Sequence, residues 1–190
     1  MKKTKPELQL DYHFFASTLG WIPVAASSKG ICLLHFCGSS PVSQESCENF
    51  LKETFPEAAL SYRKTLLLEE AEKAILKYLH ERQPLPSFPL DVRSGTPFHQ
   101  QAWKALCEIP FGQTRSYLQV AQALGKPRSP RAVGQACARN PVPLLIPCHR
   151  VIATSGGLGG FSGGIHIKEA LLEIEMVPGL TLAMVLSAEC

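Results

Sequence analysis

The sequence predicts an α+β protein, with strands and helices mixed in its amino-terminal half and helices dominating its carboxy-terminal half. Two apolar runs, residues 21–26 and 31–36, flank a short loop that contains Gly30, which is typical of a β-hairpin. Residues 65–82 repeat apolar side chains at helical spacing. After residue 94, several short segments begin at capping residues, and two of them form a helix-turn-helix pattern.

Length and composition suit one large domain or two small ones. The chain has 190 residues, 45% of them hydrophobic and 18% charged, with a mean hydropathy of +0.04. Such a chain can bury a core and is not disordered. We expect an amino-terminal α/β domain over residues 1–93, a second domain over residues 94–176 and a carboxy-terminal tail over residues 177–190.

Capping residues and prolines place the other elements. Ser43 can cap a helix that Pro56 ends, and Thr96 can cap one that starts with a proline. Residues 85–92 lie among prolines and indicate an edge strand or an extended linker. The expected helices cover residues 43–55, 65–82, 96–108, 116–125, 129–139 and 162–175, and the expected strands cover residues 21–26, 31–36 and 60–63.

Cellular location follows from the termini, the apolar runs and the cysteines. No apolar run is long enough to span a bilayer, and residues 1–9 lack the apolar centre of a signal peptide. The seven cysteines are an odd number without regular spacing, which argues against a secreted disulfide framework. We therefore expect a cytoplasmic protein, or a nuclear one in a eukaryote, with no membrane partner.

Four residues near the hairpin have side chains that can bind a metal: Cys32, His35, Cys37 and Cys47. They lack the paired spacing of a zinc finger. On a strand, His35 and Cys37 point to one face and Cys32 to the other. We therefore expect packed thiols here and no metal site.

Positive charge is concentrated in the second half, although the whole chain carries a formal net charge of only +3. Between Pro97 and Arg150 there are seven basic residues and one acidic residue, a net charge of +6, which leaves −3 for the rest of the chain. A basic half on a near-neutral protein is typical of a protein that binds a polyanion. An ordinary solvated surface gives the same count, so both interpretations remain open.

The segments 116–125 and 129–139 indicate a helix-turn-helix, although a plain helical hairpin has the same pattern. The second segment is rich in small residues, among them Ala132, Gly134 and Ala136, so it can approach another surface closely. It contains few of the side chains that identify bases in the major groove. This favours backbone and minor-groove contact with little sequence preference.

The most distinctive stretch is residues 143–152, where an apolar run ends at Pro147 and presents Cys148 beside His149 and Arg150. A thiol attacks as its thiolate, and neighbouring cationic groups favour that form. Prolines before and within the run stiffen the backbone that leads to the cysteine. A buried structural cysteine is the alternative interpretation of an isolated Cys-His pair.

The flanking sequence makes this stretch specific. Asn140 is followed by Pro-Val-Pro, and a glycine-rich segment, residues 155–164, follows the run. Together with Pro-Cys-His-Arg-Val, these segments resemble the active-site region of the O6-alkylguanine-DNA alkyltransferases, the methylated-DNA–protein-cysteine methyltransferases. The resemblance is strong from about Phe98 to Glu175 and weak before that. It implies a small amino-terminal α/β domain with an antiparallel sheet, then a mostly helical, winged-helix-like catalytic domain.

The resemblance implies DNA repair by direct reversal, in which Cys148 irreversibly accepts one alkyl group from O6-alkylguanine, with O4-alkylthymine as a second substrate left open. Glu175 then orients His149, which takes the thiol proton through water, and Asn140 supports the reactive turn. Tyr117 is the candidate proton donor to the base. This chemistry requires no cofactor and no metal. The residues alone leave simpler roles open: a turn residue for Asn140, a core side chain for Tyr117 and a surface carboxylate for Glu175.

The resemblance also implies a monomer that binds double-stranded DNA from the minor-groove side and turns the alkylated nucleotide out of the stack. An oxygen inside a duplex cannot reach a buried thiol, so the nucleotide must leave the helix. Arg131 matches the family's arginine finger, which fills the vacated space, although a phosphate contact is the simpler role. The expected DNA-binding residues are Ser116, Tyr117, Arg131, Ala132, Gln135 and Arg139.

Four residues are expected to line the substrate pocket: Pro143, Val151, Phe161 and Ser162. Backbone groups near Val151 and the Ser162 region would contact the edge of the base, while Pro143 and Phe161 would line the part of the pocket that holds the alkyl group. Phe161 stands where the family frequently has a tyrosine, so the ring is kept and a hydroxyl is lost.

Three other functions share part of this pattern. Alkyltransferase-like proteins recognise damage with the same pocket but lack the cysteine, which is present here as Cys148. A helix-turn-helix regulator would need an added regulatory domain and side chains that identify bases in the major groove. A cysteine hydrolase would need a nucleophile elbow or a conventional triad, and it would leave the basic helix pair unexplained.

Overall fold

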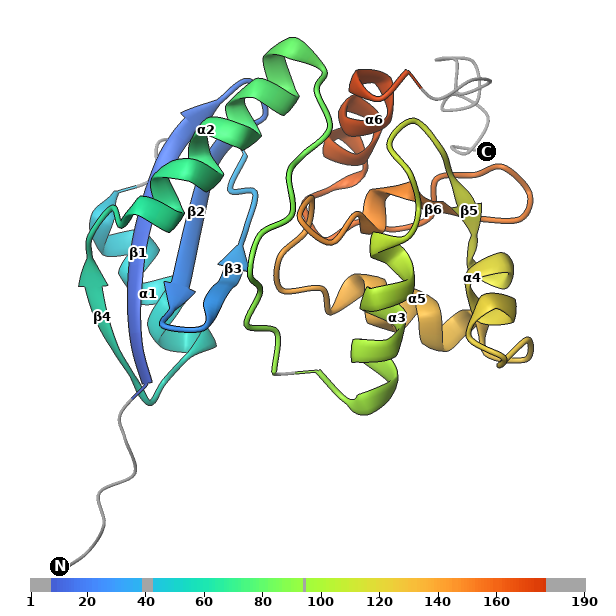
Figure 1. Cartoon of the computed structure of the whole chain (residues 1–190), viewed down its shortest axis with the longest axis horizontal. Coiled ribbons are helices and arrows are strands. Elements are labelled where there is room, and N and C mark those ends of the chain that lie inside the picture. The colour runs from blue at the N-terminus through green and yellow to red at the C-terminus, as the bar shows by residue number, and fades with distance from the viewer. Residues whose placement is uncertain (1–7, 39–42, 94, 177–190) are drawn as a thin grey trace, which may run out of the picture.

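The computed structural model describes residues 8–38, 43–93 and 95–176 and shows an α+β fold (Figure 1). Four strands, β1 (Leu8–Ser17), β2 (Gly20–Ser27), β3 (Gly30–Leu34) and β4 (Ala58–Tyr62), form a sheet in the order β3-β2-β1-β4. Its β1–β2 and β2–β3 pairs are antiparallel, whereas β1 and β4 are parallel. The predicted hairpin is confirmed as β2 and β3. The expected tail, residues 177–190, and most of the residues searched for a signal peptide lie outside the described ranges.

Strand β1 is the element that the sequence analysis missed. It lies between β2 and β4 and pairs with both, so it is central to the sheet. Its partners in β4 begin at Ala58, about fifty residues further along the chain. Local patterns carry no information about this parallel pairing. The strand itself had local signals, since Leu-Gln-Leu-Asp-Tyr-His-Phe alternates apolar and polar side chains and Gly20 ends the turn that follows.

The two faces of the sheet belong to different hydrophobic clusters. On one face, helix α1 (Gln44–Thr54) buries Cys47 and Leu51 against Leu10, Tyr12 and Cys32. On the other face, helix α2 (Leu66–Glu81) packs in a larger cluster that continues into the carboxy-terminal half. The thiols of Cys32 and Cys47 are therefore core side chains. Among the described residues, no group of three or more His, Cys, Asp or Glu side chains could hold a metal ion.

The free edge of β3 is covered by the linker at residues 82–96. Ile31 donates its backbone N–H to Pro89 O at 2.9 Å, and Asp91 donates to Ile31 O at 2.8 Å. Only one bridge, Ile31 with Leu90, has strand geometry, so this segment is an extended linker rather than a strand. Gly30 permits the close approach, because a Cβ atom there would lie 2.3 Å from Pro89 O.

The carboxy-terminal half is mainly helical (Figure 1). It contains α3 (Pro97–Cys107), α4 (Tyr117–Ala123), α5 (Pro130–Ala138), a 3-10 turn η1 (Cys148–Arg150) and α6 (Ile165–Ile174). Two short strands, β5 (Arg115–Ser116) and β6 (Val151–Ile152), pair in parallel. The predicted caps of α3 and α4 are confirmed, since Thr96 and Ser116 accept backbone N–H groups of the first turn. The last helix was predicted to begin at residue 162, three residues before its observed start at Ile165. Gly164 has a φ of 97°, which is not a helical conformation, so the helix begins only after it.

The helix pair α4–α5 is held against α3 in the predicted helix-turn-helix arrangement. Trp103 of α3 is buried and donates its Nε1–H to Ala136 O of α5 at 2.8 Å. Val133 and Ala136 are buried on the same side of α5, which leaves the opposite side of this helix in solvent. None of the helices in the described ranges is long and apolar enough to cross a membrane.

Candidate active site

Cys148 lies at the start of η1, where a short turn after the apolar run presents its side chain. Only 3% of the residue is exposed. Asn140 organises this turn from within, because its Nδ2 donates to Ile146 O at 2.8 Å and to Cys148 Sγ at 3.1 Å. Its Oδ1 accepts the N–H of Val142 at 3.1 Å. The simpler role of a plain turn residue therefore does not describe Asn140, which is buried and contacts the thiol directly.

Leu144, in the middle of the run, has a φ of 77° although it is not glycine. A left-handed backbone conformation is costly for a bulky residue other than glycine, and it persists only where the surrounding structure enforces it. Leu144 is 2% exposed and belongs to the larger core cluster, so packing supplies that enforcement. The turn that precedes the thiol is thus fixed from both sides, by Asn140 and by the core.

The resting thiol of Cys148 is protonated at neutral pH. Burial raises its pKa to about 11, although the hydrogen bond from Asn140 and the positive charge of Lys168 oppose this effect. The guanidinium of Arg150, which the sequence suggested would favour the thiolate, does not act on the thiol. Arg150 bonds instead to Glu175 and to Ile109 O. Because burial disfavours a free thiolate, this thiol could act as a nucleophile only with a base that takes its proton.

Lys168 was not predicted as a functional residue, yet its side chain is completely buried. Its Nζ donates to Val151 O at 2.6 Å and to Leu158 O. Burial lowers its pKa to about 8, against the opposing effect of the Cys148 and Cys137 thiols. A lysine between Ile167 and Leu171 on the apolar side of α6 was the signal in the sequence that could have revealed it.

Glu175 follows the last residue of α6 and is 2% exposed, so it is not a surface carboxylate. Its Oε1 contacts His149 Nε2 at 2.8 Å and accepts Arg150 Nη2 at 2.8 Å. Its Oε2 accepts Arg150 Nε at 2.9 Å and Gly112 N at 3.0 Å. Burial alone would raise its pKa, but these donors, above all His149 and Arg150, lower the pKa to about 2. Glu175 is therefore an anion throughout the physiological range.

The anionic state of Glu175 fixes the tautomer of His149. An ionised carboxylate only accepts hydrogen bonds, so Nε2 of His149 carries its hydrogen. Burial lowers the pKa of His149, with Glu175 acting in the opposite direction, and the resting imidazole is neutral. Its Nδ1 has no hydrogen-bond partner among the described residues. The ring therefore holds a buried lone pair without a partner among the described residues, which is the protonation state that a general base needs.

Tyr117 is the first residue of α4 and is half-buried between α5 and the glycine-rich segment. A Cβ atom at Gly159 would lie 2.7 Å from its hydroxyl oxygen, and one at Gly134 would lie 3.8 Å from its ring. Burial raises the pKa of Tyr117 to about 12, so the hydroxyl remains a donor at neutral pH.

Two of the four expected pocket residues line one open pocket, but Cys148, Val151 and Phe161 are not among the residues that line it. Pro143 and Ser162 line an open pocket of about 430 Å³, together with Asn140. Phe161 packs its ring on Phe36 from the amino-terminal half, at 6.2 Å between centroids. Val151 is fully buried in the larger core cluster.

The expected DNA-binding residues lie on or beside α4 and α5. Arg131, Gln135 and Arg139 are exposed and recur every four residues, so they share one side of α5 and its end. Ala132 is half-buried beside them. Ser116 uses its hydroxyl to cap α4, accepting the N–H of Gln119 at 3.1 Å.

Comparison with known proteins agrees with this geometry. A family model described as the DNA-binding domain of 6-O-methylguanine DNA methyltransferase matches residues 97–177. A methylated-DNA–protein-cysteine methyltransferase of Methanosarcina barkeri is 39% identical over 168 residues, which are 86% of this chain and 96% of that protein. The bifunctional transcriptional activator/DNA repair enzyme Ada of Escherichia coli is also 39% identical, over 88% of this chain and 46% of its own length.

Solved structures are similar over nearly the whole chain. A crystal structure of the Mycobacterium tuberculosis O6-methylguanine methyltransferase matches with a TM-score of 0.72 and 31% identity, covering 93% of this chain and 99% of that one. A crystal structure described as Mycobacterium tuberculosis OGT in complex with DNA matches with a TM-score of 0.70 and 33% identity. The match covers 87% of this chain and 92% of that one.

Proposed function

The chain belongs to the methylated-DNA–protein-cysteine methyltransferase family, and on that premise we propose that it repairs DNA by transferring an alkyl group from O6-alkylguanine to its own Cys148. The observation that carries this proposal is the buried Cys148 held by Asn140 beside a neutral His149 that Glu175 orients. O4-alkylthymine remains a second substrate to test.

The reaction begins with the removal of the thiol proton. His149 Nδ1 accepts this proton through a water molecule, and Glu175 stabilises the imidazolium that forms. The sulfur of Cys148 then attacks the alkyl carbon in line. A carbon–sulfur bond forms, the bond between this carbon and O6 breaks, and its electron pair goes to the guanine.

The departing guanine needs a proton, since an anionic base is a poor leaving group. Tyr117, whose burial keeps its hydroxyl protonated, is the donor to a ring nitrogen in this proposal. The proton held by His149 then returns through water to the Tyr117 phenolate, so that in the net balance the thiol and the alkylated base become a thioether and guanine. No cofactor takes part, and because the thioether is inert, each molecule acts once.

The nucleotide reaches the thiol by leaving the duplex. In this proposal the exposed side of α5 contacts the minor groove, and Arg131 enters the space that the nucleotide vacates. The remaining candidates, Ser116, Ala132, Gln135 and Arg139, contact the backbone around it. The protein acts as a monomer in the cytoplasm, or in the nucleus of a eukaryote, with residues 1–93 and 94–176 as its two domains.

Mass spectrometry of the intact protein tests the proposal directly. The chain is mixed with a duplex that carries one O6-methylguanine, and the product is digested and mapped. One methyl group per protein, located on Cys148, is the expected result. DNA binding without an adduct would instead indicate a recognition module, and the absence of both would contradict the proposal.

Arg131→Ala is expected to slow repair of duplex DNA roughly tenfold, with a much smaller effect on reaction with free O6-benzylguanine, because only the duplex requires a nucleotide to be turned out. Arg128→Ala is the matched control, since it removes the same charge from the exposed loop between α4 and α5. The measurement is single-turnover kinetics with both substrates. Equal slowing of both substrates by Arg131→Ala, or equal effects of the two variants on the duplex, would contradict the arginine-finger role.

Salt is expected to weaken DNA binding steeply. Five of the seven basic residues between Pro97 and Arg150 are exposed, and each phosphate contact releases a counterion. If about four phosphates are contacted, the dissociation constant rises by roughly two orders of magnitude between 50 and 200 mM salt. Fluorescence anisotropy with an undamaged duplex measures this slope. An affinity that does not change with salt would show that the basic residues do not face DNA.

A further inference from the structure

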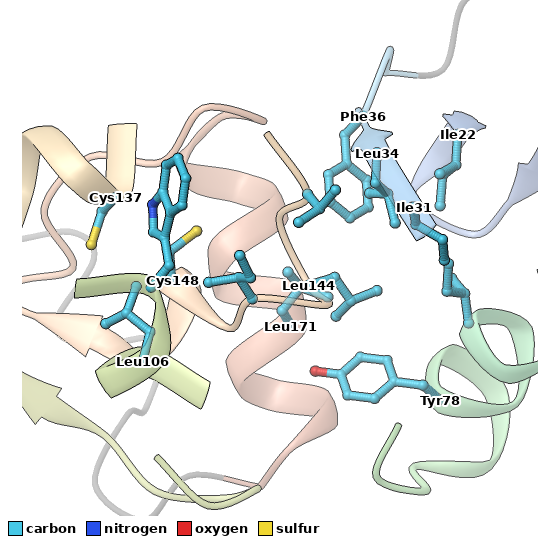
Figure 2. Close-up of a cluster of buried hydrophobic side chains, with 14 of the residues drawn as sticks. Ile22, Ile31, Leu34, Phe36, Tyr78, Leu106, Cys137, Leu144, Cys148 and Leu171 are labelled. Carbon is cyan, nitrogen blue, oxygen red and sulfur yellow. The ribbon is translucent and has the colours of Figure 1, made fainter. Parts of the chain in front are cut away.

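Tyr78 of helix α2 reaches out of the amino-terminal half into the active site. Its ring is completely buried and its hydroxyl donates to Glu175 Oε1 at 2.7 Å, across 97 positions of the sequence. The hydroxyl oxygen of Tyr78 lies 3.5 Å from His149 Nε2. Figure 2 shows the ring extending from α2 with its hydroxyl directed toward the carboxy-terminal half.

The ring and the hydroxyl of Tyr78 serve different purposes. The ring packs edge-on against Phe111 at 5.8 Å, within the core that joins the two halves, and a phenylalanine ring could fill that space equally well. The hydroxyl adds a hydrogen bond to a carboxylate that already receives Arg150 and His149. Burial first, and then the charge of Glu175, raise the pKa of Tyr78 far above its usual value. The hydroxyl is thus a donor at every pH at which the protein is folded.

We propose that Tyr78 is a positioning residue for alkyl transfer, through which the amino-terminal half sets the orientation and basicity of His149. The hydroxyl holds Oε1 of Glu175 in place, and this oxygen holds Nε2–H of His149, so that Nδ1 stays free for the thiol proton. The inference rests on the proposed function, since it assigns a role within that reaction.

The hydrogen bond from Tyr78 also limits the basicity of His149. Oε1 shares its negative charge among Tyr78, Arg150 and His149, and the loss of one donor strengthens its attraction for a protonated imidazole. The other charged or titratable groups that act on His149 are Arg150 of η1, Lys168 of α6 and the Glu175 carboxylate itself. Tyr78→Phe leaves all three in place. The pKa of His149 is therefore expected to rise in this variant by about half a unit.

Tyr78→Phe in the full chain tests the inference, with Tyr12→Phe as the matched control. Tyr12 is also completely buried, and its hydroxyl also donates to a carboxylate, that of Glu48, but it lies in the cluster on the far face of the sheet. Four quantities are measured for each variant: the single-turnover rate of methyl transfer at saturating duplex from about pH 5 to pH 9, duplex affinity, melting temperature, and the pKa of His149 by NMR.

For Tyr78→Phe, we expect transfer about tenfold slower at neutral pH, with unchanged duplex affinity, an acidic limb of the rate profile moved to higher pH and a raised His149 pKa. Tyr12→Phe is expected to retain the wild-type rate and profile. A wild-type profile for Tyr78→Phe, or equal and pH-independent slowing in both variants, would overturn the positioning role.

The two proposals fail in different ways. A wild-type chain that forms no methyl adduct contradicts the proposed function, whatever Tyr78 does. A wild-type chain that forms the adduct, together with a His149 pKa that does not move in Tyr78→Phe, leaves the proposed function standing and refutes the role of Tyr78.

Discussion

Replacing Cys148 with alanine is expected to abolish alkyl transfer completely while leaving DNA binding within about twofold of wild type. The sulfur of Cys148 is the atom that forms the bond to the alkyl carbon in the proposed reaction. The DNA-binding candidates on α4 and α5 do not depend on the sulfur, since Ser116 caps α4 and the packing of Val133 and Ala136 fixes α5. The effect on transfer should therefore be far larger than the effect on affinity.

The measurement combines intact-mass analysis with anisotropy on the same methylated duplex. Cys107→Ala is the matched control, because Cys107 is an exposed cysteine outside the site and its removal should leave the adduct unchanged. A methyl adduct that persists in Cys148→Ala would place the acceptor elsewhere and contradict the assignment. Loss of the adduct in Cys107→Ala would do the same.

Glu175→Gln is expected to slow transfer at least about a hundredfold and to destabilise the fold by about 3–5 kcal/mol. The amide cannot stabilise an imidazolium on His149 or act as the anion that fixes its tautomer. It also leaves the guanidinium of Arg150, whose side chain is 11% exposed, without its counter-charge. Glu173→Gln is the matched control, since Glu173 lies on the same helix and is exposed.

The same carboxylate predicts how stability depends on pH. The folded-state pKa of Glu175 is lowered to about 2, whereas an unfolded glutamate has a pKa of roughly 4.3. Because the folded value is the lower one, this group contributes stability above the unfolded pKa and loses it as the pH falls toward the folded value. Urea unfolding between about pH 5 and pH 2 should show this loss in wild type and in Glu173→Gln. Glu175→Gln should be less stable at neutral pH and show a shallower decline. An equal decline in all three proteins would contradict the role of Glu175.

Local signals predicted the elements whose ends are set by neighbouring residues. Ser43, Thr96 and Ser116 each cap the helix that follows them, and the prediction succeeded because a cap bonds only three residues away. Strand β1 was missed although its apolar–polar alternation is a local signal, and only its parallel pairing with β4 depends on residues far along the chain. The pairing of Cys148 with His149 and Glu175 was inferred from a family resemblance, and periodicity alone would have left Glu175 as a surface residue.

Side-chain direction is what the sequence could not supply. Arg150 adjoins Cys148 and His149 in the sequence, yet it contacts Glu175 and Ile109 and does not act as the cation for the thiol. Lys168, twenty residues further on, supplies the nearby positive charge because helix α6 carries it into the core. Neighbours in sequence can face opposite ways, and only packing decides which one meets the sulfur.

By itself, the sequence determined several helix caps, the hairpin and the basic character of the second half, since each depends on residue types at short spacing, and its resemblance to a known family indicated Cys148 as the nucleophile. Only the tertiary structure decided that the thiol is buried and protonated, that His149 Nδ1 has no partner within residues 8–38, 43–93 and 95–176, and that Tyr78 from the amino-terminal half bonds to Glu175. These properties depend on desolvation and on contacts between residues up to 97 positions apart, and such contacts exist only in the folded chain.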